Sequence, residues 1–182
     1  MSSRSRGRQF AVQMIYQQEF TGYDLDQVLE HFWRNINADE TTRVFSRRLA
    51  EGVIERRQEL DFEIQGYLKN WTLDRIAVLD RIILELALFE LVSGKSEVPW
   101  RVVIDEAVTL AKMFSTDKSP TFINGVLHAW CAKNVSDFEN APETNGSVAR
   151  AAQAEEPPAP GLDHGFEDED EDKAQATAEE TE

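Results

Sequence analysis

The chain has 182 residues, a formal net charge of −15 and a single cysteine, so an intramolecular disulfide is excluded. The longest apolar stretch, 82–92, is interrupted by two glutamates and is too short to span a bilayer. The Ser/Arg-rich N-terminus lacks the apolar core of a signal peptide, so we expect a cytoplasmic protein without a membrane segment.

The negative charge is concentrated toward the C-terminal end. Residues 139–182 contain 14 acidic and two basic residues, whereas residues 1–138 contain 20 acidic and 17 basic residues. A strongly acidic chain ordinarily disfavours a nucleic-acid partner, because phosphate contacts require Lys and Arg. The nearly balanced body has clustered arginines, so the charge of the whole chain does not exclude RNA binding.

Three arginines, Arg4, Arg6 and Arg8, alternate with small residues at the start of the chain. Arg4 and Arg8 share one face if this end is helical, whereas Arg6 points about 200° away, so a frayed end would gather the three better. Guanidinium groups bind phosphates bidentately and stack on bases. Taken alone, the segment is either an RNA contact or a solvated N-terminus.

Apolar residues recur at helical spacing through the rest of the body, and no segment alternates with period two. We predict helices over 24–37, 42–69, 72–92, 99–114 and 119–133. Gly52 is expected to be a close-packing point rather than a break. The helix over 72–92 is apolar nearly all round, which predicts a central position, with any uncovered part available to a partner. Ser119 and Pro120 are predicted to be the N-cap and first residue of the last helix.

The composition changes after about Phe138. Residues 143–182 contain a Pro-rich stretch at 157–160, an acidic run at 167–172 and almost no large apolar side chains. Such a segment cannot bury enough surface to offset the loss of chain entropy. We therefore predict an all-α domain over 1–138 and a disordered acidic tail over 139–182.

The sequence contains no catalytic motif that we can identify. His31, His128 and His164 match neither a metalloprotease nor a zinc-binding spacing, and there is no Gly-rich phosphate loop. Asp105 and Glu106 are adjacent, so on a helix they do not face each other. We expect no enzymatic activity, no metal and no cofactor.

Five segments carry a pattern beyond helical periodicity: 4–16, 71–76, 79–81, 98–114 and 119–127, the last ending in Phe-Ile-Asn-Gly-Val-Leu. In their order and approximate spacing over residues 4–135 they resemble the NusB family of transcription antitermination factors. The resemblance implies a compact bundle of about six to seven helices that binds RNA.

The resemblance also implies an RNA surface formed by the first helix and an aromatic residue of the last helix. The residues expected to contact RNA are Arg4, Arg6, Arg8, Phe122, Lys112 and Lys118. We expect Phe122 to lie partly exposed beside the first helix, where a stacked base would contribute about 1–3 kcal/mol. Periodicity alone favours a core phenylalanine at this position, and the two lysines taken alone are ordinary surface residues.

The family also binds a small ribosomal protein that doubles as a transcription elongation factor. The matching positions are Asp74, Asp80 and Phe89, where carboxylates would suit a basic partner through steering and specificity. The alternative is ordinary helix-surface charge and one core ring. The implied partners are single-stranded boxA-like RNA of ribosomal RNA leaders, the small-subunit ribosomal protein and the transcription elongation complex, with the chain a monomer or homodimer.

The function implied by the resemblance is antitermination, in which the RNA and the ribosomal protein bind together and elongation becomes processive. The alternative is a helical protein-interaction adaptor without RNA binding. This helical domain also occurs at the front of certain RNA methyltransferases, but no Gly-rich cofactor-binding domain follows it here, so we do not expect that activity. The acidic tail either folds over Arg4–Arg8 in imitation of RNA or only increases solubility.

Overall fold

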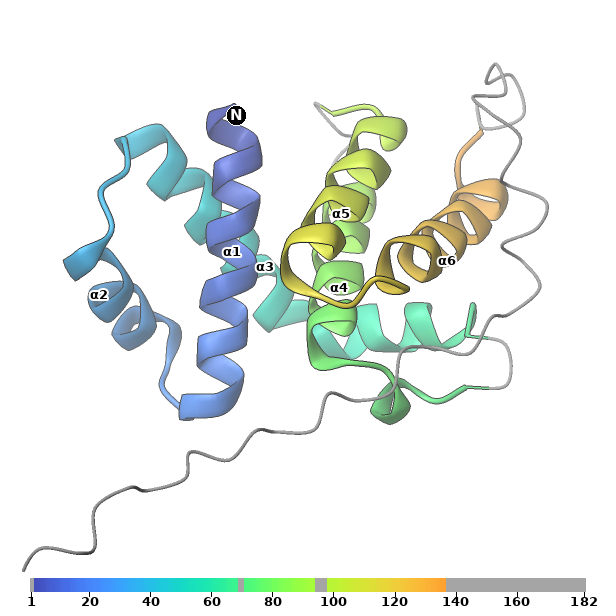
Figure 1. Cartoon of the computed structure of the whole chain (residues 1–182), viewed down its shortest axis with the longest axis horizontal. Helices are drawn as coiled ribbons and strands as arrows, with labels where there is room; N and C mark the ends of the chain where they lie inside the picture. The colour runs from blue at the N-terminus through green and yellow to red at the C-terminus, as the bar shows by residue number, and fades with distance from the viewer. Residues whose placement is uncertain (1, 69–70, 94–97, 137–182) are drawn as a thin grey trace, which may run out of the picture.

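The computed structural model describes residues 2–68, 71–93 and 98–136 (Figure 1). These residues form six α-helices and one 3₁₀ helix, and none of them lies in a strand, which confirms the predicted all-α class. The helices are α1 (Ser3–Thr21), α2 (Leu25–Asn35), α3 (Glu40–Gln65), the 3₁₀ helix η1 (Leu73–Arg75), α4 (Val78–Ser93), α5 (Trp100–Phe114) and α6 (Ser119–Asn134). The predicted domain end at 138 and the predicted tail over 139–182 lie outside the described residues.

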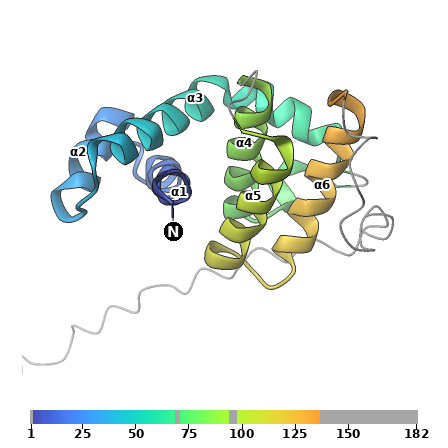
Figure 2. The same cartoon turned by 90° about the horizontal axis from the view of Figure 1, so that it is seen from above.

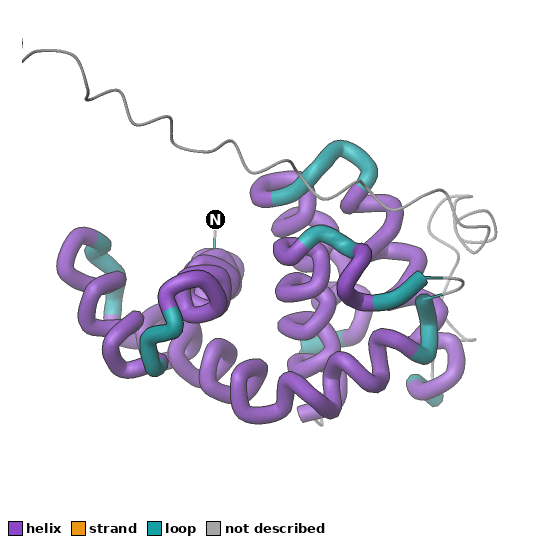
Figure 3. Tube along the Cα trace, turned by 90° about the horizontal axis from the view of Figure 1, so that it is seen from below, coloured by secondary structure: helices purple, strands orange, loops and turns teal. Residues whose placement is uncertain are grey.

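The helices form two groups that are joined by the long helix α3. Helix α1 packs against α2, α3 and α4, whereas α6 packs against α4 and α5. Figure 2 shows α3 running across both groups, with α5 between α1 and α6, and the tube in Figure 3 shows the same helical arrangement from below. Within the described ranges, no helix combines the length and the apolar character that crossing a membrane requires.

Helix α4 is the central element, as its apolar circumference predicts. Every residue from Ile82 to Leu88 is buried, including the charged residue Glu85. The helix contacts α1 and α3 of one group and α5 and α6 of the other, so both groups pack their apolar side chains against it. A helix surrounded in this way must be apolar on most sides, because each face is removed from water.

The predicted helix over 72–92 is interrupted, which corrects the sequence analysis. Residues 73–75 form the 3₁₀ helix, Ile76 is extended (φ −91°, ψ 154°), and α4 begins only at Val78. The side chain of Gln65 accounts for part of this break: its amide donates to the Trp71 carbonyl (2.8 Å) and accepts from the Leu73 N–H (3.1 Å). These two hydrogen bonds hold residues 71–73 at the end of α3, so these residues do not continue α4 toward its N-terminus.

Gly52 is a close-packing point inside α3, as predicted. Helix α3 continues through it, and a Cβ at this position would overlap the ring of Phe89 from α4. The absence of a side chain therefore lets Phe89 pack directly against the backbone of α3. Helix α3 begins at Glu40, two residues before the predicted start at 42, because Asp39 caps the helix by accepting the Thr42 N–H at 2.9 Å.

Candidate nucleic-acid interface

The arginines at the start of the chain belong to an ordered helix. Helix α1 begins at Ser3, and the Ser2 hydroxyl oxygen caps it by accepting the Ser5 N–H at 3.1 Å. The first turn has no acidic residue, so nothing there offsets the positive end of the helix dipole. The helical geometry places Arg4 and Arg8 near one ring, that of Phe45 on α3, whereas Arg6 lies near Phe10.

Arg4 and Arg6 are exposed at the surface. The Arg6 guanidinium donates to the backbone carbonyl of Asn37 at 3.0 Å and lies 5.2 Å from the ring centre of Phe10. The guanidinium of Arg4 lies 6.0 Å from the ring centre of Phe45 on α3. Both guanidinium groups therefore lie against aromatic rings, and both residues are exposed to solvent.

Arg8 has a different position, and here the structure departs from the predicted RNA contact. Its side chain is only 3% exposed, and its Nε and Nη2 donate to the two carboxylate oxygens of Glu90 at 2.7 and 2.8 Å. Glu106 on α5 lies 3.7 Å from Arg8 Nη1 and also accepts a hydrogen bond from the Ser5 hydroxyl at 2.6 Å. Because its guanidinium group is buried and paired with carboxylates, Arg8 holds α1 against α4 and α5 instead of presenting a free donor to RNA.

Lys112, Lys118 and Phe122 form a second group around the connection between α5 and α6. Both lysines are exposed, whereas Phe122 is half-buried and packs against the core. Lys112 lies six residues beyond Glu106, which corresponds to about 9 Å along the axis of α5. In both Figures 1 and 2, α5 lies between α1 and α6, and α6 packs mainly against α5 and α4. The expected contact of Phe122 with RNA beside the first helix stays a prediction.

Asp80 was predicted to be a surface contact for a protein partner, but its side chain is buried. It accepts hydrogen bonds from the hydroxyls of Ser115 (2.6 Å) and Ser119 (2.9 Å). Burial raises the pKa of the Asp80 carboxyl above its usual value, although the two hydroxyl donors lower it. The cluster therefore fastens the α5–α6 connection to α4, which positions Lys118 and the start of α6.

The same cluster corrects the predicted N-cap of the last helix. Ser119 is the first residue of α6 rather than its cap, and Lys118 occupies the cap position without a side-chain hydrogen bond. The Ser119 hydroxyl is buried against Asp80 and accepts the Thr116 N–H at 3.3 Å. A serine before a proline suggested a local cap, but the long-range carboxylate is the stronger acceptor for its hydroxyl proton.

Of the other two residues predicted to contact a protein partner, Asp74 is exposed in the 3₁₀ helix and Phe89 is half-buried. The Phe89 ring packs against Gly52, so much of its surface is used inside the domain. Asp74 is therefore the member of the predicted partner set whose charge reaches the surface.

A buried charge cluster between α1, α3 and α4 was not found by sequence reasoning. Glu85 is fully buried, and its carboxylate oxygens lie 3.6 Å from nitrogens of both Arg57 and Arg81. Glu19 pairs with the same two arginines. Burial raises the pKa of Glu85 to about 8; the charge of Asp61 also raises it, whereas the two arginines lower it. Three carboxylates face two guanidinium groups, so a proton on Glu85 balances the cluster.

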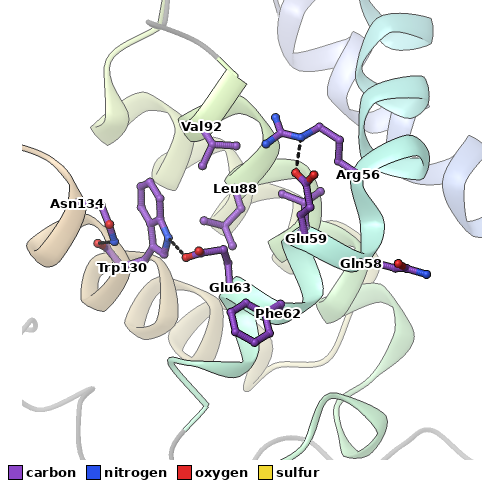
Figure 4. A pocket seen from close by; sticks show the side chains of 10 residues that line it. Arg56, Gln58, Glu59, Phe62, Glu63, Leu88, Val92, Trp130 and Asn134 are labelled. Carbon is purple, nitrogen blue, oxygen red and sulfur yellow. Dashed lines mark hydrogen bonds and ion pairs between the residues drawn. The ribbon is translucent and has the colours of Figure 1, made fainter.

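Among the depressions lined by described residues, two bear on the candidate site and its surroundings. The larger, of about 660 Å³, lies between α3, α4 and α6 (Figure 4). Its polar side chains are engaged with one another: Trp130 donates to Glu63 at 3.3 Å, and Arg56 pairs with Glu59 at 2.9 Å. Phe62 at its rim is 80% exposed.

The smaller depression, of about 430 Å³, lies between the start of α1 and the first turns of α3. Its lining residues are Ser3, Arg4, Glu40, Thr41, Val44, Phe45 and Arg48. It therefore joins the exposed arginine of the predicted interface to a second arginine, Arg48, which sequence reasoning missed. No sequence signal identified Arg48, because α3 contains several arginines and nothing in the sequence distinguishes this one from the others.

The described part of the chain contains no group of three or more His, Cys, Asp or Glu residues arranged to hold a metal ion. Burial raises the pKa of the Cys131 thiol to about 12, so this buried group is protonated near neutral pH.

Comparison with known protein sequences gives matches over nearly the whole described region. The sequence model of the NusB family matches residues 5–131. The transcription antitermination protein NusB of Geobacter sulfurreducens is 39% identical over 133 residues, which cover 70% of this chain and 92% of that protein. The protein of the same name from Macrococcus caseolyticus is 42% identical over 125 residues, which cover 69% of this chain and 93% of that protein.

Solved structures give the same picture. NusB of T. maritima has a TM-score of 0.66 at 33% sequence identity, and the match covers 73% of this chain and 93% of that chain. A chain in the crystal structure of the antitermination factors NusB and NusE in complex with dsRNA has a TM-score of 0.65 at 26% identity, covering 73% of this chain and 98% of that chain.

Proposed function

Since the chain belongs to the NusB family, we propose that it is a transcription antitermination factor that binds boxA-like RNA together with a ribosomal protein. The observation that carries this proposal is the match to antitermination proteins over more than nine tenths of their own length. Such a factor works where RNA is transcribed, in the cytoplasm of a bacterial cell. No bond is made or broken in the proposed mechanism.

RNA binding starts from the exposed guanidinium groups of Arg4 and Arg6. Phosphates release counterions when such groups neutralise them, which supplies affinity without selecting a sequence. Phe122 would add base preference by stacking, and Lys112 and Lys118 would extend the positive surface from α5 to the start of α6. Arg8 contributes indirectly, since its buried ion pair keeps the start of α1 in place.

The proposal of a protein partner is supported by one of the similar structures, in which the antitermination factor NusE occurs with NusB and dsRNA. A basic ribosomal protein would be attracted by exposed carboxylates, of which Asp74 is the one retained from the predicted contact set. The burial of Asp80 assigns it to supporting the α5–α6 connection instead.

RNA binding across a salt series tests the proposal. A short single-stranded boxA-like RNA and a scrambled control are titrated with the full chain and with an Arg4→Ala/Arg6→Ala variant. If three to five phosphates are neutralised, the slope of log K against log salt should be about −2 to −3.5, at about −0.7 per contact. The variant should show a shallower slope and weaker binding.

A matched control is the Arg34→Ala/Arg56→Ala variant, which removes the same charge from arginines already paired with Glu30 and Glu59. This control should bind like the unmodified chain. A flat, unselective response both with and without the ribosomal protein would favour the alternative, a helical adaptor that does not bind RNA.

The proposal for the acidic tail, which lies outside the described residues, needs a separate comparison. If residues 140–182 compete with RNA for the arginines, their removal should tighten RNA binding at low salt and have less effect at high salt. Unchanged affinity at low salt would eliminate self-inhibition and leave the solubilising role.

A further inference from the structure

Phe45 on α3 is surrounded by arginines from two helices. The guanidinium carbon of Arg4 lies 6.0 Å from its ring centre, and those of Arg8 and Arg48 lie at 5.6 Å. The backbone of α1 approaches the ring closely at Gly7, where a Cβ would lie 2.6 Å from Phe45 Cδ1. The start of α1 is thereby held against α3, with three guanidinium groups near one ring.

Arg48 differs from the neighbouring arginine of the same helix. Arg47 is neutralised by Asp26 at 2.9 Å and by Glu51 at 2.6 Å. Arg48 is exposed, and among the described residues its guanidinium has no hydrogen bond or ion pair, only the contact with the Phe45 ring. Its charge and its donors are consequently directed at solvent beside the 430 Å³ depression.

The shape of this depression suits an anionic chain. Arg4 and Arg48 approach from α1 and α3, and Val44, which is 57% exposed, and the half-buried Phe45 form its apolar part. Glu40 is the one acidic residue of the lining, so the depression carries a net positive charge. Two guanidinium groups beside apolar side chains fit a phosphodiester with its attached sugar better than an isolated base, because the faces of Phe45 are already near cations.

We propose that the depression lined by Arg4, Val44, Phe45 and Arg48 binds a backbone phosphate of the RNA, extending the RNA surface from α1 onto α3. This inference rests on the proposed function, since it requires that the start of α1 contacts RNA. It adds a contact from α3, whereas Lys112, Lys118 and Phe122 belong to α5, α6 and the connection between them. As a phosphate contact, it contributes affinity without selecting bases.

The test measures RNA affinity for Arg48→Ala beside Arg47→Ala, each in the full chain, by fluorescence anisotropy over a salt series. Loss of one phosphate contact should weaken binding about fivefold at about 0.1 M salt and make the slope shallower by about 0.7. Arg48→Ala should show this loss equally for the boxA-like and the scrambled RNA. Arg47→Ala removes the same charge from an arginine already neutralised, and should change affinity less than about twofold.

Two further variants test whether the change in RNA affinity follows the charge of the depression. Arg48→Lys keeps the charge and should restore most of the salt slope, whereas Glu40→Gln removes the opposing carboxylate and should tighten binding. Equal loss in Arg48→Ala and Arg47→Ala would show a long-range charge effect and overturn the inference. RNA binding that depends on Arg4 and Arg6 but not on Arg48 would overturn this inference alone. If the chain binds no RNA either with or without the ribosomal protein, the proposed function would be overturned as well.

Discussion

Replacement of Arg8 by alanine removes the buried link between α1 and the α4–α5 pair. The side chains of Arg8 and Glu90 are 3% and 9% exposed and share two short hydrogen bonds. Breaking a buried pair by removing one partner costs about 3–5 kcal/mol, because the remaining charge is left uncompensated. For a helical domain of this size, the melting temperature should fall by roughly 10–20 °C.

Urea unfolding followed by circular dichroism measures this loss, and two variants establish its origin. Arg8→Met/Glu90→Leu replaces the pair by apolar side chains and should recover most of the stability. Arg6→Ala removes an exposed arginine two positions away and should change the free energy of unfolding by less than about 0.5 kcal/mol while weakening RNA binding. A loss below about 1 kcal/mol in Arg8→Ala, together with an RNA defect like that of Arg6→Ala, would refute the structural role.

Three other positions give further expectations. Gly52→Ala should destabilise the protein by about 1–3 kcal/mol in urea unfolding, because the clash with the Phe89 ring exceeds the gain in helix propensity. A Gly52→Ala/Phe89→Leu variant should recover stability, and a more stable single variant would contradict this packing. Asp80→Ala should cost about 1–3 kcal/mol in thermal unfolding, since the hydroxyls of half-buried Ser115 and buried Ser119 lose their acceptor; an unchanged melting temperature would argue against this cluster. Folded Glu85 keeps its proton up to about pH 8, whereas the unfolded chain releases it near 4.5, so stability should fall as pH rises between these values. The slope from this group is at most about 1.4 kcal/mol per pH unit, and Glu85→Gln should flatten it; equal slopes in both proteins would show that Glu85 does not hold the proton.

Most of the fold could be predicted because helices are specified by local spacing. The apolar periodicity located each helix after the first, and Gly52 was correctly interpreted as a packing point, since propensity alone does not end a long helix. The error at 72–92 had a non-local cause. The Gln65 side chain forms hydrogen bonds with the backbone of Trp71 and Leu73, and no pattern within residues 72–92 predicts the approach of a side chain from the preceding helix.

The candidate interface could be predicted only in part. The motif drew attention to the start of α1, where Arg4 and Arg6 are exposed, and their contact with RNA stays a prediction. It did not distinguish them from Arg8, whose partner Glu90 is 82 positions away. Arg48 was missed for the opposite reason, because a single exposed arginine on a helix has no distinctive sequence context.

The sequence by itself determined the helical class and the family, since hydrophobic spacing and short motifs are local properties of the chain. Only the tertiary structure decided what each charged side chain does. Asp80 and Arg8 looked like surface charges, but burial and partners from distant helices made them internal links. The physical reason is that the cost of a charge depends on its solvent exposure and its neighbours, and both are set when the helices pack together.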